Sequence, residues 1–225
     1  MTIRAVPEHD DTQSLLRLWL DGDHAAAVDL FERDRDWIER EIRKRRGAAL
    51  RQLEETSDAI QELALRVLEY TPRFLVASRA QFRRLLARMI SNLLADRGRS
   101  LASRPLPVAV AMTVSATDAS RACLVLTGDS RSPAPPSVAA RSEELGWIRI
   151  GLEFMPPTDR RLIHARTFEE LDFTTAGAAL GMSPDAARMR FHRGLLRLTR
   201  VVKRLRGGEL ELLLAEREAA DATED

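Results

Sequence analysis

The chain has 225 residues, of which 44% are hydrophobic and 31% are charged, and its formal net charge is +1 at pH 7. This composition indicates a soluble globular protein with one large or two small cores. No apolar run approaches the roughly 20 residues that cross a bilayer, and the first residues do not resemble a secretory signal, so we expect no membrane insertion and a cytoplasmic location.

Residues 1–102 are predicted to form a helical domain. Apolar side chains recur at intervals of three and four, the spacing of a helix with one buried face. We expect four helices, at approximately residues 12–21, 23–47, 56–71 and 78–97. Pro72 ends the third of them, because a proline disfavours helical geometry in the residue before it.

The fourth helix has the clearest pattern in the chain. Its core stripe consists of Phe82, Leu85, Leu86, Met89, Ile90, Leu93 and Leu94. The opposite face carries Arg84, Arg88, Ser91, Asn92 and Ala95. Because the stretch from Arg79 to Arg104 contains only one acidic residue, Asp96, this face is predicted to be a basic surface that contacts a polyanion.

Residues 103–136 differ in composition from the rest of the chain. They are rich in serine and alanine and contain Pro105, Pro107, Pro133, Pro135 and Pro136. This composition is typical of a flexible linker. A short β-hairpin is the alternative, because residues 108–114 alternate as a strand does and residues 124–126 are able to pair with them. A lone hairpin is only marginally stable, which favours the linker.

Residues 137–208 are predicted to form a second helical domain. One helix runs from Ser137 to the break at residues 156–157, and the next begins at Thr158 or Asp159. Residues 167–206 then have the pattern of a helix, a tight turn and a second helix.

The turn at residues 181–183 has the chemistry of a helix-turn-helix. Gly181 suits a left-handed turn conformation, Ser183 is able to cap the second helix, and Pro184 suits its first position. The buried stripe of this helix is predicted to be Ala187, Phe191, Leu195 and Leu198.

The other face of the second helix is basic. Arg188, Met189, His192 and Arg193 project away from the stripe, and no acidic residue stands between residues 188 and 206. This pattern is typical of a helix that enters the major groove of DNA. The alternative is an amphipathic helical hairpin whose basic face is only solvated.

Residues 209–225 form an acidic tail, in which Arg217 is the only basic residue. The tail is close enough in sequence to fold back over the basic helix and mask it. The chain is thus expected to be all-α, with two small helical domains joined by a flexible proline-rich linker.

Two helical domains in this order, with a helix-turn-helix at the end of the second, resemble a bacterial RNA polymerase sigma factor of the extracytoplasmic-function type. The resemblance covers nearly the whole chain except the linker and the tail. It rests on residues 18–27, 57–63 and 82–96 for sigma region two, and on residues 154–161 and 178–193 for region four.

The resemblance implies a role for each matching position. Asp58, Gln61 and Glu62 match the motif that docks on the clamp helices of core RNA polymerase. The positions that match contacts to the minus-ten promoter element are Tyr70, Phe74, Arg84, Arg88, Asn92 and Asp96. Those that match contacts to the minus-thirty-five element are Arg188, Met189, Arg190, His192, Arg193 and Arg197.

Gly177 and Gly194 depart from what is expected of the two helices of the helix-turn-helix, since a glycine inside a helix costs about 1 kcal/mol relative to alanine.

The partners that follow from the resemblance are core RNA polymerase and promoter DNA, with an anti-sigma factor as a further candidate. The family is not catalytic, and no cofactor or small-molecule substrate is expected. The four histidines are scattered, and Cys123 is the only cysteine, which excludes an internal disulfide and a multi-cysteine zinc site.

The main alternative function is that of a helix-turn-helix transcriptional regulator that binds duplex DNA without polymerase. An interaction protein that binds polymerase without opening promoters is a further alternative.

Overall fold

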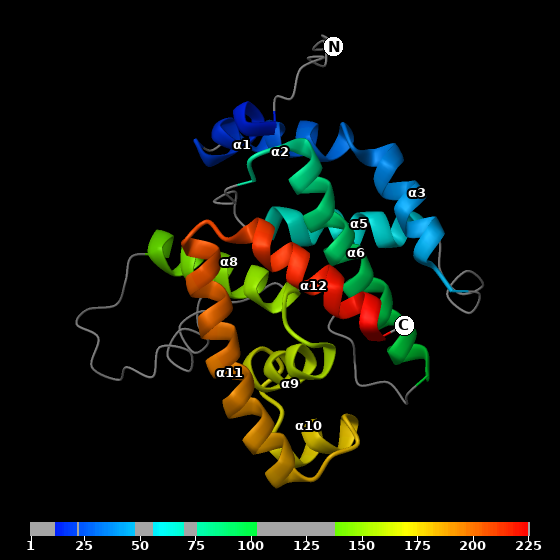
Figure 1. Cartoon of the computed structure of the whole chain (residues 1–225), viewed down its shortest axis with the longest axis vertical. Helices are drawn as coiled ribbons and strands as arrows, with labels where there is room; N and C mark the ends of the chain where they lie inside the picture. The colour runs from blue at the N-terminus through cyan, green and yellow to red at the C-terminus, as the bar shows by residue number, and fades with distance from the viewer. Residues whose placement is uncertain (1–11, 22, 48–55, 70–75, 103–137, 225) are drawn as a thin grey trace. The chain divides into compact units, whose positions relative to one another are not determined.

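The computed structural model describes residues 12–21, 23–47, 56–69, 76–102 and 138–224 (Figure 1). Every regular element within these ranges is a helix, which confirms the all-α prediction. The contacts divide the chain into unit 1, residues 1–102, and unit 2, residues 103–225. The predicted linker and its alternative hairpin lie outside the described residues. No helix among the described residues combines the length and the apolar character that a membrane span requires.

The helices of unit 1 are α1 (Thr12–Leu20), α2 (His24–Glu32), α3 (Arg35–Arg45), α5 (Thr56–Glu69) and α6 (Arg79–Ala102). Those of unit 2 are α8 (Val138–Glu153), α9 (Pro157–Thr167), α10 (Phe173–Ala179), α11 (Pro184–Arg206) and α12 (Leu210–Glu224).

The prediction of one long helix over residues 23–47 is wrong, because the chain breaks between α2 and α3. Asp34 stands at the break, and its side chain is completely buried. Its Oδ1 accepts hydrogen bonds from Nε of Arg79, at 2.9 Å, and from Nε of Arg83, at 2.8 Å, both on α6. This pairing accounts for the break. Arg79 and Arg83 follow Asp34 by 45 and 49 positions in the sequence, and helical periodicity does not reveal contacts between residues so far apart.

Helix α6 begins as predicted but extends five residues further, to Ala102. The Ser78 hydroxyl accepts a hydrogen bond from the backbone N–H of Gln81, at 3.2 Å, and so caps the helix. Helix α6 packs against both α3 and α5. Among its described side chains only Ala80 is exposed, and Arg88 and Asn92 are buried, which contradicts the prediction of a basic surface at these positions.

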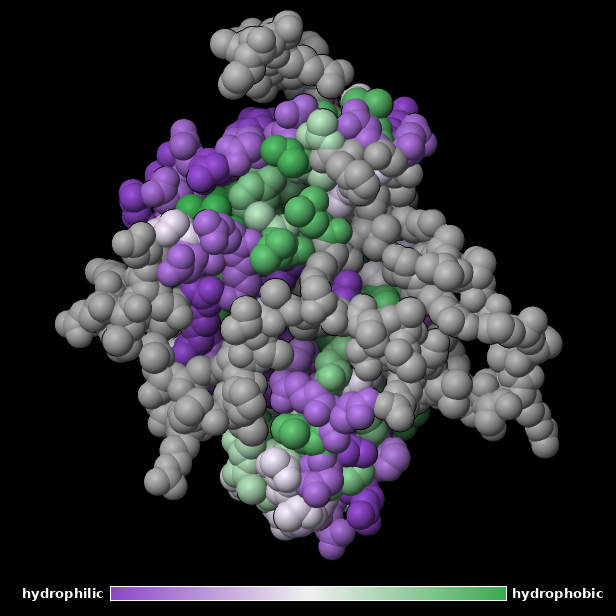
Figure 2. All heavy atoms as spheres, turned by 180° about the vertical axis from the view of Figure 1, so that it is seen from behind, coloured by the Kyte–Doolittle hydropathy of each residue, from purple (hydrophilic) through white to green (hydrophobic). Residues whose placement is uncertain are grey.

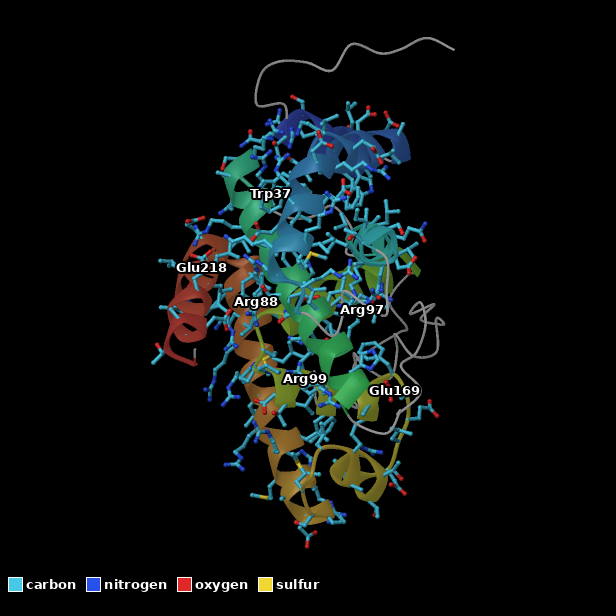
Figure 3. The ribbon with its side chains drawn as sticks, turned by 90° about the vertical axis from the view of Figure 1, so that its right-hand side faces the viewer. Trp37, Arg88, Arg97, Arg99, Glu169 and Glu218 are labelled. Atoms are coloured by element: carbon cyan, nitrogen blue, oxygen red, sulfur yellow. The ribbon has the colours of Figure 1, made fainter. Side chains whose placement is uncertain are left out.

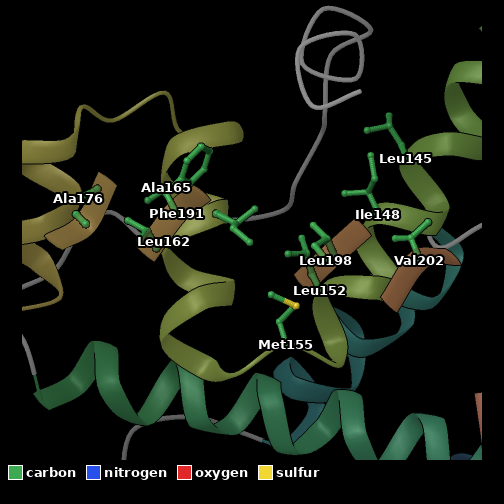
Figure 4. Packing of buried hydrophobic residues seen from close by; sticks show 12 residues of the cluster. Leu145, Ile148, Leu152, Met155, Leu162, Ala165, Ala176, Phe191, Leu198 and Val202 are labelled. Carbon is green, nitrogen blue, oxygen red and sulfur yellow. The ribbon is translucent and has the colours of Figure 1, made fainter. Parts of the chain in front are cut away.

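The core of unit 2 lies around α11, which packs against α8, α9 and α10 (Figure 4). Phe191 of α11 also meets the ring of Phe173 edge to face, with 5.6 Å between the centroids. The buried side chains of the cluster are Leu145, Ile148, Leu152, Met155, Leu162, Ile163, Ala165, Ala176, Ala187, Phe191, Leu198 and Val202. Because all three neighbouring helices contribute to it, the cluster fixes which face of α11 points outward.

The turn between α10 and α11 has the predicted chemistry. Gly181 has a φ of +68°, which is the left-handed conformation that favours glycine. The Ser183 hydroxyl accepts a hydrogen bond from the backbone N–H of Ala186 at 3.3 Å, and Pro184 occupies the first helical position. These predictions are confirmed.

The structure also explains Gly177. A Cβ atom at this position would lie 2.8 Å from the backbone carbonyl oxygen of Met182. The absence of a side chain therefore lets α10 approach the turn closely, and the glycine is required by packing despite its cost to the helix.

Replacing Gly177 by alanine is expected to lower the free energy of unfolding of unit 2 by about 2 kcal/mol, because the turn backbone must move to admit the methyl group. Gly98 of α6 is a matched control, since nothing lies within 4 Å of the Cβ it would carry. Gly98→Ala is expected to stabilise the protein by about 0.5–1 kcal/mol. Urea denaturation measures both, and equal effects would contradict the packing explanation.

The acidic tail forms helix α12. Its Leu210, Leu213 and Leu214 are buried. Two of its carboxylates bind the end of α11: Glu209 accepts from Nε of Arg204 at 2.8 Å, and Glu216 accepts from Nη1 and Nη2 of the same guanidinium, both at 2.8 Å. The hydrogen bonds from Arg204 lower the pKa of Glu216 below its usual value. The tail is thus attached near the last turn of α11, at a distance in sequence from Arg188, Met189, His192 and Arg193.

Candidate nucleic-acid interface

The outward face of α11 begins directly after the turn. Arg188, Met189, His192 and Arg193 are all exposed, and Met189 is 60% exposed. Positions four apart on a helix share a face, so these four side chains form one patch over the second and third turns. The structure therefore confirms that they project away from the buried stripe.

Arg188 is held close to the turn. Its Nη1 lies 3.6 Å from Oδ1 of Asp185, and its guanidinium lies 5.5 Å from the centroid of the Phe173 ring. Arg193 donates from Nε to the carbonyl oxygen of Met189 at 3.4 Å. Both guanidinium groups remain largely accessible, which leaves hydrogen-bond donors for a ligand.

Arg190 and Arg197 have a different environment, because both bind the carboxylate of Asp159 on α9. Arg190 donates from Nε to Oδ1 at 2.7 Å, and Nη1 of Arg197 donates to Oδ2. The Asp159 side chain is 3% exposed, whereas the arginine side chains are 41% and 51% exposed. These two arginines, which match contacts to the minus-thirty-five element, thus also join α11 to α9. The sequence did not reveal this role of Asp159, because its partners follow 31 and 38 residues later.

Replacing Asp159 by asparagine is expected to lower the free energy of unfolding of unit 2 by about 2 kcal/mol, because two charge-assisted hydrogen bonds are weakened. Asp185→Asn is the matched control, since its carboxylate is 91% exposed and its loss should change stability little. Thermal unfolding followed by circular dichroism measures both variants. Equal melting temperatures would show that the Asp159 contacts contribute nothing.

The predicted polymerase-docking positions lie on α5 of unit 1. Asp58 and Gln61 are exposed, and Leu65 and Leu68 continue the same exposed stripe with 50% and 44% of their surface accessible. Figure 2 shows apolar side chains gathered on unit 1, in the upper part of that view. An exposed apolar stripe beside acidic and amide groups is typical of a protein-binding surface.

Glu62 is half-buried and already has partners inside unit 1. Its Oε1 accepts from Arg66 at 2.6 Å, and its Oε2 accepts from Nη2 of Arg97 at 2.5 Å. Arg97 belongs to α6 (Figure 3), so Glu62 connects α5 to α6. Glu62 thus differs from Asp58 and Gln61: it binds arginines within unit 1, whereas the other two side chains are exposed, although all three belong to one sequence motif.

Four of the six positions expected at the minus-ten element belong to the described residues, and these four do not form one open surface. Tyr70 and Phe74 lie outside the described residues. Arg88 and Asn92 are buried, at 8% and 3% exposure, which contradicts their expected place on a free face. Arg84 is half-buried, and so is Asp96, which binds Arg99 at 3.0 Å. Helix α6 packs against both α3 and α5.

Among the described residues, no three His, Cys, Asp or Glu side chains come together as they would around a metal ion. No protein-family model matches the chain, and no curated protein is significantly similar to it in sequence.

Proposed function

We propose that this chain is a sigma factor that binds core RNA polymerase through unit 1, recognises promoter DNA and initiates transcription of a specific set of genes. The observation that carries the proposal is the exposed patch of Arg188, Met189, His192 and Arg193 on a capped helix that follows a helix-turn-helix turn. The resemblance to extracytoplasmic-function sigma factors supports the assignment of unit 1.

The α11 patch has the chemistry of a base-reading surface. A helix fits the major groove of B-DNA, where an arginine can bind the O6 and N7 atoms of guanine with two hydrogen bonds. Arg188, which is exposed near the start of α11, would take that role, and Met189 would offer an apolar contact to a thymine methyl group. Arg193 supplies charge for phosphate, which positions the helix without reading sequence.

The α5 stripe supports a protein partner for unit 1. Asp58 and Gln61 present polar groups, while Leu65 and Leu68 present apolar area that water solvates poorly. In this proposal unit 1 binds core RNA polymerase through the α5 stripe, unit 2 binds promoter DNA through α11, and the chain itself catalyses no chemical step.

The test is binding of the full chain to bacterial core RNA polymerase, followed by transcription in vitro from genomic templates. We expect a stable complex and transcripts with defined start points. The double variant Asp58→Ala/Gln61→Ala should weaken the complex, whereas Asp36→Ala, which removes an exposed acid from α3, should not. Absence of any complex would refute the proposal.

A helix-turn-helix transcriptional regulator is the second candidate, favoured by the fact that the α11 patch serves duplex binding equally well without polymerase. The same experiment separates the two. Sequence-specific binding to duplex DNA together with no affinity for core polymerase would favour the regulator.

A further inference from the structure

Phe173, the first residue of α10, contacts Arg188 but has no role in the proposed function. Its ring is half-buried and packs against the core cluster of unit 2. The guanidinium of Arg188 lies over this ring, 5.5 Å from its centroid. The contact therefore joins the first helix of the helix-turn-helix to the α11 patch, at the side chain that is proposed to read a base.

The Phe173 ring is itself fixed by its neighbours. The guanidinium of Arg166, from α9, lies 4.3 Å from the ring centroid, and its Nη1 donates to the carbonyl oxygen of Leu171. The buried Phe191 meets the same ring edge to face, with 5.6 Å between the centroids. Closely packed side chains keep a single rotamer, so the ring has little freedom to turn. Arg188 thus lies against a surface that stays in place.

Arg188 has a second neighbour, Asp185, whose contact is of a different kind. Nη1 of Arg188 lies 3.6 Å from Oδ1 of Asp185, and this carboxylate is 91% exposed, so water and salt weaken the pairing. A carboxylate also competes for the N–H groups that a base would need. An aromatic ring contacts the face of a guanidinium, which leaves the N–H groups along its edge free for the O6 and N7 atoms of guanine.

We propose that Phe173 is a positioning residue for base recognition, whose ring holds the Arg188 guanidinium in the orientation that reads a guanine in the major groove. A long exposed side chain loses rotamer freedom when it binds, and a contact that orders it beforehand reduces that loss. The inference rests on the proposed function and deepens it, because it adds a determinant of sequence specificity that does not itself touch DNA.

The experiment measures discrimination by the full chain at one base pair. Selection from duplexes with a randomised central segment gives the preferred sequence, and Arg188→Ala identifies the base pair that Arg188 reads. Fluorescence anisotropy then gives the dissociation constants for the preferred duplex and for a duplex changed at that pair. Partial unfolding weakens both complexes equally, so a purely structural role of Phe173 would leave the ratio of the two constants unchanged. We expect Phe173→Leu to reduce this discrimination ratio about 2- to 10-fold.

Matched variants separate the ring from the packing of the core. Phe173→Tyr keeps the ring and should discriminate as the wild type does. Phe173→Met fills the core with a flexible side chain that lacks a ring, so it should lose discrimination, and it decides the test if Phe173→Leu fails to fold. Phe168→Leu is the control, because Phe168 also packs against the core cluster of unit 2 but its ring adjoins His164. It should leave the discrimination ratio unchanged.

A double-mutant cycle tests whether Phe173 acts through Arg188. In the Arg188→Ala background, Phe173→Leu should not change the discrimination ratio further. An equal reduction in both backgrounds, or a wild-type ratio in Phe173→Leu and Phe173→Met, would overturn the proposal. If Arg188→Ala changed no preference, the base-reading role of Arg188 would fall together with this inference. Binding of core polymerase is measured on the same variants, so that the sigma-factor assignment is tested separately.

Discussion

Replacing Asp34 by asparagine is expected to lower the free energy of unfolding of unit 1 by about 3 kcal/mol. The substitution removes the carboxylate shared by Arg33, Arg79 and Arg83 and leaves three cations close together. Breaking a buried ion pair from one side costs about 3–5 kcal/mol, and the lower end applies because the Arg79 and Arg83 side chains are 40% and 33% exposed. Chemical denaturation of the full chain, with a probe in unit 1, measures the loss.

The stabilisation by Asp34 should also depend on pH. Burial alone would raise the pKa of this carboxyl, but hydrogen bonds from Arg79 and Arg83 outweigh that effect and lower the pKa below its usual value. A group whose pKa is lower in the folded state contributes fully above its unfolded pKa, and the contribution is lost as the pH falls through the folded pKa. The wild type and Asp34→Asn should therefore converge in stability in acid.

Asp36→Asn is the control for this prediction, since Asp36 is an exposed acid two residues further along the chain, in α3. It should alter stability little at neutral pH. If Asp34→Asn and Asp36→Asn melt at the same temperature as the wild type, the cluster around Asp34 does not stabilise unit 1.

Replacing Arg188 by glutamate is expected to abolish discrimination at one base pair of the promoter. A two-hydrogen-bond contact between arginine and guanine is worth about 1–3 kcal/mol of discrimination, or about 5- to 150-fold in affinity. In the wild-type protein Asp185 pairs with Arg188. In the variant the glutamate stands beside Asp185 instead, so the start of α11 acquires a negative surface. Selection from a randomised pool of duplex sequences measures the change in preference.

Arg193→Gln is the companion variant. Because Arg193 is proposed to contact phosphate, its loss should weaken binding to all sequences equally and reduce the salt dependence of binding by about one unit. If Arg188→Glu instead weakened binding to every sequence equally, with no change in preference, the assignment of Arg188 as a base reader would be refuted.

Local features of the helix-turn-helix were predictable from the sequence. The φ of Gly181, the cap by Ser183 and the outward direction of Arg188 and Arg193 depend on residues within a few positions of one another. The buried stripe of α11 follows from the helical repeat for the same reason. The all-α class follows from many such stretches in succession.

The features that the sequence did not predict depend on contacts between residues that are distant in sequence. Asp34 divides a predicted helix because its partners lie on α6, and Asp159 binds two arginines that the sequence presents as free for DNA. Arg88 and Asn92 are buried because the surroundings of α6 depend on how other helices pack.

The sequence by itself therefore determined the all-α class, how the turn before α11 is built and which side of α11 is apolar. Only the tertiary structure decided which charged side chains remain accessible to a partner. The physical reason is that helix formation and capping are governed by short-range contacts along the chain, whereas burial and ion pairing depend on contacts between separate helices.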